Sequence, residues 1–317
     1  MRPTTQYRPA SVGRRLSLPV QPAAYGRKTY AVVLAFTLLL LPACSSRRPF
    51  APEPTPHAGQ LIEADITYRE VAEGYNATVA QFDKLFLRTY VRLAWQETDG
   101  DGDTRYRSEA GDGKIMFAAP GNTVLTIEKL SRVYLWAGSN DEQYWLFDQL
   151  DESNKVAYVG HYDAAGSSDT RMLPIPFRPD AVPYLLGLVA LDPALDSRVY
   201  TYDGQYLIEP AGMRMRMLID PTSFRPTRVD LLDERGWSLV MCKLTGRFGV
   251  EVEGVPSQRW PVVCDDAELF VAGQASNMSI ELIHATNNPR RVRDQLFDLD
   301  VLMEALKPDA LVDLDAR

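Results

Sequence analysis

The sequence predicts an α+β fold in which one large, curved antiparallel sheet is capped by short helices. Three observations predict this class. Roughly a dozen short stretches alternate apolar and polar residues, turn residues separate these stretches, and only a few stretches show helical spacing. We therefore expect a single globular domain over residues 61–317, preceded by an export signal and a tether.

The first 43 residues have the features of a signal peptide. Arg27 and Lys28 precede an apolar stretch over 29–43, and Cys44 follows. The segment Leu41-Pro42-Ala43-Cys44 is similar to the bacterial lipobox, where a peptidase cuts before a cysteine that carries diacylglycerol and palmitate. Proline stands where that motif usually has a small residue. A plain secretory signal or an uncleaved anchor is the alternative.

Residues 44–60 are expected to form a tether, because four prolines favour an extended chain. Lipidation of Cys44 would anchor the domain to a membrane of the cell envelope, facing the periplasm. Serine rather than aspartate follows the cysteine. By the sorting rule of enteric bacteria, this residue favours the outer membrane over the inner one.

Charge and motif content restrict the function. The formal net charge of the whole chain is −8. Residues 1–43 hold six basic residues and no acidic one, so the chain from Cys44 onward carries a larger negative charge. No nucleic-acid partner is therefore expected. The chain has no Gly-x-Ser-x-Gly elbow and no glycine-rich phosphate loop, and His161 and His284 lie far apart. We expect no enzymatic activity, no cofactor and no metal site.

The globular part begins with a predicted helix over 63–85, in which Gly74 is the weak position. The period then changes to two, and alternate residues of a strand share one face. These residues are Leu87, Val91, Leu93 and Trp95. An acidic run over 99–103 predicts a hairpin turn rather than a calcium loop.

Further short strands are predicted along the rest of the chain. They span 114–118, 122–128, 132–137, 143–148, 155–161, 198–203, 205–209, 213–220, 227–233, 237–244, 258–265 and 278–284. An apolar helical insert over 181–191, bounded by prolines, interrupts them. Residues 298–307 have helical spacing and are a candidate for a last helix that lies over a cavity.

The strand over 213–220 carries an unusual row of methionines. Met213, Met215 and Met217 share one face, and two arginines share the other. Methionine is flexible and polarisable, so such a row suits a surface that must fit variable apolar shapes. Ordinary core packing is the alternative.

The order of several motifs is typical of one known family. A strand ends in GKIMFAAP (113–120), a Gly-Ser-Asn-Asp turn leads to YWLF (144–147), and LIDPTSFRP (218–226) is followed by DERG (233–236). Over residues 64–284 the sequence resembles the LolA/LolB family of lipoprotein carriers and receptors. A lipidated member resembles LolB, the anchored receptor, more than the soluble carrier.

This resemblance implies an unclosed antiparallel barrel with helices on its open side and lipid acyl chains in an apolar cavity. The expected lining residues are Leu87, Val91, Leu93, Trp95, Met213, Met215 and Met217. An arginine on an early strand is important in the family, and Arg88 and Arg92 both lie near the matching place. The acidic turn at 99–103 and the extension after His284 depart from LolB.

Two cysteines remain once Cys44 is lipidated. A hairpin that turns near residue 253 would bring Cys242 and Cys264 opposite each other, and an exported protein meets an oxidising compartment. The pair is therefore a disulfide candidate, and two buried free thiols are the alternative.

The sequence favours a membrane-anchored lipoprotein that binds acyl chains or a lipidated partner. The alternative is a non-catalytic interaction or sensor module with a filled core. An apolar cavity lined by Leu93, Trp95, Met215 and Met217 favours the first function, and the same residues packed without a void favour the second.

Overall fold

The computed structural model describes residues 61–79, 82–98, 104–119, 121–162, 177–272 and 277–316, without the side chains of 95–98, 104, 105 and 107. The signal peptide, Cys44, the whole tether and the acidic turn at 99–103 lie outside the described residues. Residues 51–317 form one compact unit.

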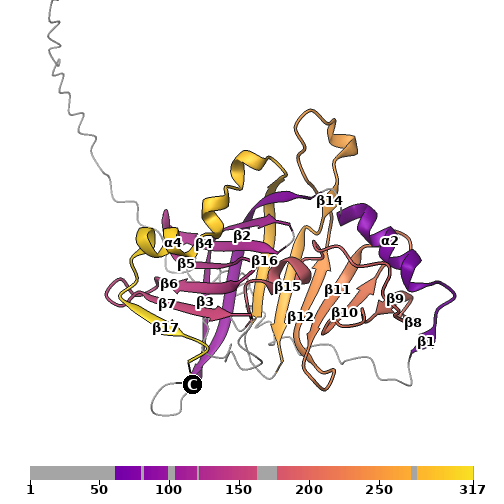
Figure 1. Cartoon of the computed structure of the whole chain (residues 1–317), viewed down its shortest axis with the longest axis horizontal. Helices are drawn as coiled ribbons and strands as arrows, with labels where there is room; N and C mark the ends of the chain where they lie inside the picture. Colours follow the sequence, from indigo (N-terminus) through magenta and orange to yellow (C-terminus); the bar gives the residue numbers. More distant parts are fainter. Residues whose placement is uncertain are drawn as a thin grey trace, which may run out of the picture. The chain divides into compact units, whose positions relative to one another are not determined.

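One sheet of 15 strands dominates this unit (Figure 1). Its order is β1-β8-β9-β10-β11-β12-β15-β16-β2-β3-β4-β5-β6-β7-β17, and every pair is antiparallel except β7 with β17. The edge strands β1 and β17 do not pair with each other, so the sheet is unclosed. The predicted fold class, a large unclosed antiparallel sheet with short helices, is confirmed.

The strand bounds follow the turn residues closely. The strands are β1 (Ile62–Glu63), β2 (Lys84–Thr98), β3 (Thr104–Ala118), β4 (Asn122–Lys129), β5 (Arg132–Ser139), β6 (Gln143–Asp148), β7 (Val156–His161), β8 (Val199–Tyr202), β9 (Gln205–Ile208), β10 (Met215–Ile219), β11 (Pro226–Leu232), β12 (Ser238–Thr245), β15 (Asp266–Val271), β16 (Asn277–Thr286) and β17 (Ala310–Asp313). A separate ribbon pairs β13 (Phe248–Gly249) with β14 (Val262–Val263).

The predicted strand at 258–265 is wrong. Its sequence forms a 3-10 turn, η3 (Ser257–Arg259), followed by the two-residue β14, and the sheet strand β15 comes afterwards. Prolines at 256 and 261 remove backbone donors from this stretch, which prevents a longer ladder.

The first helix, α2 (Tyr68–Val79), is shorter than predicted and begins with a capping box. Thr67 N donates to Glu70 Oε2 at 2.9 Å, and Glu70 N donates to Thr67 Oγ1 at 3.3 Å. The Thr67 hydroxyl also donates to Glu70 Oε2, at 2.7 Å, and the bonds from the Thr67 amide and hydroxyl lower the pKa of the Glu70 carboxyl. Gly74 lies within the helix because the ring of Phe224 packs on it, and a Cβ there would be 2.6 Å from Phe224 Cγ.

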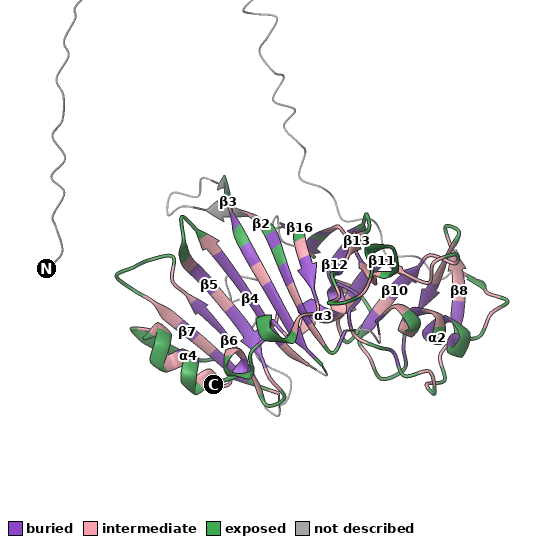
Figure 2. Cartoon of the chain, turned by 90° about the horizontal axis from the view of Figure 1, so that it is seen from above, coloured by how far each residue is buried: buried purple, intermediate pink, exposed green. Residues whose placement is uncertain are grey.

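The sheet has one continuous apolar face, here called the inner face. It joins both halves of the sheet in a single buried cluster, and buried residues mark the strands from β7 to β8 (Figure 2). Its members include Leu87, Val91, Leu125, Met217, Val229 and Ile280. α2 and the segment 177–191, here called the insert, contribute to the same cluster.

The insert contains less helix than predicted. α3 covers only Ala181–Leu185, and Gly187 then adopts a φ of +66°. That left-handed conformation ends the helix and allows Gly187 to lie against Pro226. The remaining residues form turns, and Phe177, Leu186 and Leu188 are buried.

The C-terminal segment covers the opposite, outer face of β2–β7. Helix α4 (Leu299–Leu306) confirms the predicted helix, and Asp298 caps it by accepting bonds from Asp300 N and Val301 N. Its Leu302 packs with Trp145 and Phe147 on the outer face. The prediction that this helix lies over a cavity of the inner face is therefore wrong.

Helix α4 lies on the outer face because the strands in this half of the sheet are apolar on both faces. Strand β6 is buried at four consecutive residues, Tyr144 to Phe147. Val292 and Phe297 cover Met116 and Val124 in the same way. A sheet that is apolar on both sides needs a cover on each.

We predict that Gly74→Ala destabilises the protein by about 1–3 kcal/mol, because the new methyl group would overlap the Phe224 ring. Helix propensity alone predicts the opposite, a gain of about 1 kcal/mol. Urea unfolding measures the difference. In a Phe224→Ala background the same substitution should stabilise, and stabilisation in the wild-type background would contradict the packing described here.

Candidate binding face and pocket

The predicted lining residues lie in the packed core of the inner face. Leu87, Val91, Met215 and Met217 are at most 4 % exposed, and all four belong to the cluster that contains the insert. Leu93 and Met213 are half-buried against this cluster. The side chain of Trp95 lies outside the described residues. The space over the four buried residues is thus filled by protein.

The alternation in β10 is as predicted. Met215 and Met217 point to the inner face. Arg214 and Arg216 lie on the outer face, where they pair with Glu234 and Glu209. The methionine row can therefore contact whatever covers the inner face.

The insert and α2 are hydrogen-bonded to each other. Asn76 Nδ2 donates to Leu191 O at 2.6 Å, and Leu191 N donates to Asn76 Oδ1 at 2.8 Å. Tyr75 Oη donates to Val189 O at 2.9 Å, and burial raises the pKa of this phenol. Together α2 and the insert, here called the cover, lie over the inner face.

The cover contacts the sheet mainly through apolar side chains. Among the described residues, no hydrogen bond joins the insert to a strand. At the start of the insert, Arg178 pairs with Asp180 and lies 5.5 Å from the Tyr144 ring and 5.3 Å from the Tyr162 ring. Burial raises the pKa of the Asp180 carboxyl, against the lowering effect of Arg178.

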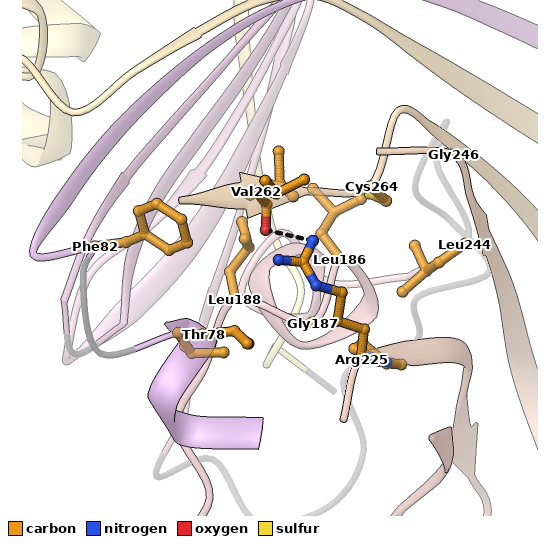
Figure 3. A pocket seen from close by; sticks show the side chains of 13 residues that line it. Thr78, Phe82, Leu186, Gly187, Leu188, Arg225, Leu244, Gly246, Val262 and Cys264 are labelled. Atoms are coloured by element: carbon orange, nitrogen blue, oxygen red, sulfur yellow. Dashed lines mark hydrogen bonds between the residues drawn. The ribbon is translucent and has the colours of Figure 1, made fainter. Parts of the chain in front are cut away.

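A small cavity of about 50 Å³ lies at one margin of the cover (Figure 3). The end of α2, the insert, the ends of β11 and β12, and the β13–β14 ribbon surround it. Its walls include Phe82, Leu186, Leu188, Leu244, Val263 and Cys264. A water needs about 10–15 Å³ of such space, so the cavity has room for a few waters but not for an acyl chain.

Arg225 is the charged residue of this lining. Its Nη1 donates to Val262 O at 3.0 Å, and the guanidinium points into the ring of lining residues (Figure 3). Burial lowers the pKa of Arg225, and the nearby positive charge of Arg247 lowers it further. The loop before it is held by Asp220, whose Oδ1 accepts bonds from the backbone and hydroxyl groups of Ser223, both at 2.7 Å. These bonds lower the pKa of the Asp220 carboxyl.

The two early-strand arginines do not lie beside the cover. Arg88 and Arg92 alternate with Leu87 and Val91, so they are on the outer face. Arg88 is within 3.7 Å of Asp112, and its side chain is 55 % exposed. Neither therefore reaches the inner face.

The register expected for the two cysteines is wrong. Cys242 pairs across the sheet with Leu269 of β15, because the ribbon and η3 occupy the intervening chain. Cys242 and Cys264 are free thiols here. Burial raises the pKa of both, to about 12 for Cys264, so both remain neutral.

The remaining candidates form no reactive cluster. His161 lies at the end of β7, where its Nδ1 is 3.1 Å from Asp315, and His284 Nε2 is 3.8 Å from Glu251. In the part of the chain that the structure describes, His, Cys, Asp and Glu nowhere gather in a group able to hold a metal ion. Within those same ranges, no helix has the length and apolar character needed to cross a membrane.

Asn76 and Arg225 were missed by sequence reasoning. Asn76 has its partner 115 residues further along the chain, and no local pattern announces such a bond. Arg225 precedes the last proline of the LIDPTSFRP motif, and this motif did not predict that the arginine lines a cavity.

No protein-family model matches the chain, and no curated protein matches it. Several solved structures are similar to this chain, and three of them are compared with it here. A DUF1329 family protein from Desulfovibrio piger is 13 % identical, with a TM-score of 0.46 over 74 % of this chain and 97 % of its own. A LolA superfamily protein from Nitrosomonas europaea is 11 % identical, with a TM-score of 0.41 over 72 % and 94 %. A Vibrio parahaemolyticus domain, assigned by name to outer membrane lipoprotein sorting, is 10 % identical, with a TM-score of 0.47 over 74 % and 97 %.

We predict that Asn76→Ala lowers the free energy of unfolding by about 1–3 kcal/mol, because it leaves the backbone groups of Leu191 without partners. Glu73→Ala on the exposed side of the same helix is the matched control and should change it by less than about 0.5 kcal/mol. Urea unfolding measures both. Equal effects would show that the bond to the insert contributes nothing.

We predict that Asp220→Asn destabilises the protein at neutral pH and that the effect shrinks in acid. The lowered pKa means that ionised Asp220 stabilises the fold fully above the unfolded-state pKa of about 3.9, and that this contribution is lost as pH falls through the folded-state value. Thermal unfolding from pH 7 to pH 3 should show the gap between the two proteins narrowing below about pH 4. Asp141→Asn, in a turn without these bonds, should match the wild type throughout, and a gap that does not narrow in acid would contradict the account.

Proposed function

We propose that this protein is a membrane-anchored envelope lipoprotein that binds acyl chains, or the acyl chains of a lipidated partner, against the inner face of its sheet. The bound chain takes the place of the insert, so that the cover and the ligand exchange. The role is one of binding and transfer, without catalysis.

The observation that carries this proposal is how the inner face is covered. A continuous apolar surface lies under short segments whose hydrogen bonds join them to each other rather than to the strands. Apolar contacts are non-directional, so an acyl chain can replace the insert without leaving strand donors or acceptors unpaired. A core closed by strands or by hydrogen-bonded helices would resist such an exchange.

The methionine row supports this exchange. Met215 and Met217 lie at the inner face with the insert in the same cluster. Their unbranched side chains adapt to different neighbours. The row therefore accommodates either the leucines of the insert or the methylenes of a ligand.

The proposed anchor comes from the sequence. The lipobox-like LPAC segment ends at Cys44, and the proline-rich stretch to residue 60 leaves the domain at a distance from the membrane. Ser45 after the cysteine favours the outer membrane. The resemblance of motif order to LolA and LolB supports the same compartment.

A second function is favoured by the filled core. Leu87, Val91, Met215 and Met217 are packed, as an interaction or sensor module requires. Such a module would dock another envelope protein and leave its inner face permanently closed.

Native mass spectrometry of the chain from Ser45 onward, with and without added phosphatidylglycerol and a neutral diacylglycerol, distinguishes the two functions. We predict lipid adducts that survive desalting, with a higher occupancy in Asn76→Ala, because this variant loosens the cover. Glu73→Ala should behave as the wild type.

An adduct-free mass in excess lipid, for the wild type and for Asn76→Ala alike, would contradict acyl binding. It would favour the docking module instead. Partner capture with the anchored chain would then identify the protein bound.

A further inference from the structure

Arg225 differs from the other arginines that the structure buries or half-buries. Arg216 and Arg228, whose side chains are 11 % and 6 % exposed, each pair with a carboxylate, Glu209 and Asp230 respectively. Arg225 makes no such ion pair within the described residues, and its hydrogen bond to Val262 O uses one donor of Nη1. A guanidinium has five N–H donors in a planar fork, so the others are available to a ligand.

The surroundings of Arg225 keep this positive charge unpaired. The charge that affects it from nearby is another cation, Arg247, which also lies close enough to Asp220 to act on that carboxyl. Asp265 lies beside Gly246 of the lining but is not itself one of the lining residues. Cys264 is neutral, and Thr78 donates its hydroxyl to Tyr75 O. The cavity thus presents one half-buried cation, and no acidic side chain is among its lining residues.

The cavity also lies where a ligand would enter. Leu186 and Leu188 of the insert form part of its wall, together with the end of α2 at Val79. Movement of the insert would open the cavity directly onto the inner face. A molecule that reaches both places needs an anionic head and an apolar tail.

We propose that this cavity is an anionic head-group subsite: Arg225, assisted by Arg247, binds the phosphate or carboxylate of an amphiphile whose tail runs beneath the insert. The inference rests on the proposed function and adds to it the polarity of the ligand and the end at which the ligand is held. Bidentate binding by a guanidinium suits a phosphate or carboxylate and rejects a cationic head.

Because residues 51–317 form a compact unit, the test uses the chain from Ser45. Octyl phosphate, inorganic phosphate and octyltrimethylammonium are titrated by calorimetry below the micelle concentration. We expect octyl phosphate to bind at least tenfold more tightly than either of the others. Arg225→Gln should weaken it by about tenfold or more, since a charge-assisted hydrogen bond of this kind is lost.

Arg235→Gln is the matched control. Arg235 is exposed in the β11–β12 turn, so this substitution removes the same charge outside the cavity. Its affinity for octyl phosphate should equal that of the wild type. Arg247→Gln should weaken binding by a smaller factor than Arg225→Gln.

A measurement on the wild-type chain keeps the test valid if Arg225→Gln fails to fold. The Arg225 Nε–H resonance should shift on titration with octyl phosphate, and an unmoved resonance would overturn the proposal. Equal binding of inorganic phosphate and octyl phosphate would also overturn it and would indicate a site for a free anion.

Failure of this inference is distinguishable from failure of the proposed function. If octyl phosphate binds Arg225→Gln as tightly as the wild type while neutral diacylglycerol still forms adducts, the head-group subsite is refuted and acyl binding stands. If no amphiphile of any charge binds, both are refuted.

Discussion

The fold depends on the need to cover the inner apolar face of an unclosed sheet. A closed barrel buries such a face by curvature alone, whereas here β1 and β17 remain unpaired edges and the chain must supply the cover itself. It does so with α2 and the insert, which lie far apart in sequence and are joined by the bonds of Asn76 and Tyr75. The outer face of β2–β7 also needs a cover, and α4 and the 3-10 turns before it provide one. Burial on both faces explains why several strands are apolar throughout.

The two covers differ in how they are attached, and this difference is why the proposed binding is placed at the inner one. The outer cover continues into β17, which adds a parallel strand beside β7 from Ala310↔Val156 to Asp313↔Val159. Its removal would cost ladder hydrogen bonds as well as apolar contacts. The insert has no ladder bond to lose among the described residues. At its margin lies Arg225, which has no carboxylate partner among the described residues and would give the proposed exchangeable face a polar end. The proposed binding and the proposed orientation of an amphiphile both rest on this one arrangement.

Sequence periodicity predicted which residues share a face, but not what lies over that face. The alternation of methionine and arginine at 213–217, the strand after Leu85 and the helix before Pro308 were all predicted, because each is a local pattern. The position of α4 was not, since both faces of β6 are apolar and the pattern favours neither. The predicted cysteine register was wrong because it assumed one hairpin where the β13–β14 ribbon and the 3-10 turn η3 intervene. The bonds of Asn76 and the unpaired state of Arg225 depend on residues more than 30 positions away, beyond any local rule.

The central claim is that ligand and insert occupy the same space, and hydrogen exchange tests it most directly. The amides of Leu186, Leu188 and Leu191 are bonded to Val182 O, Pro183 O and Asn76 Oδ1 in the present structure. Exchange would be compared between lipid-free and lipid-loaded chains, with the amides of β4 and β5 as the internal reference. The account predicts that loading speeds exchange in the insert and leaves the reference strands unchanged. Equal or slower exchange throughout the insert, in a chain shown to carry lipid, would contradict it.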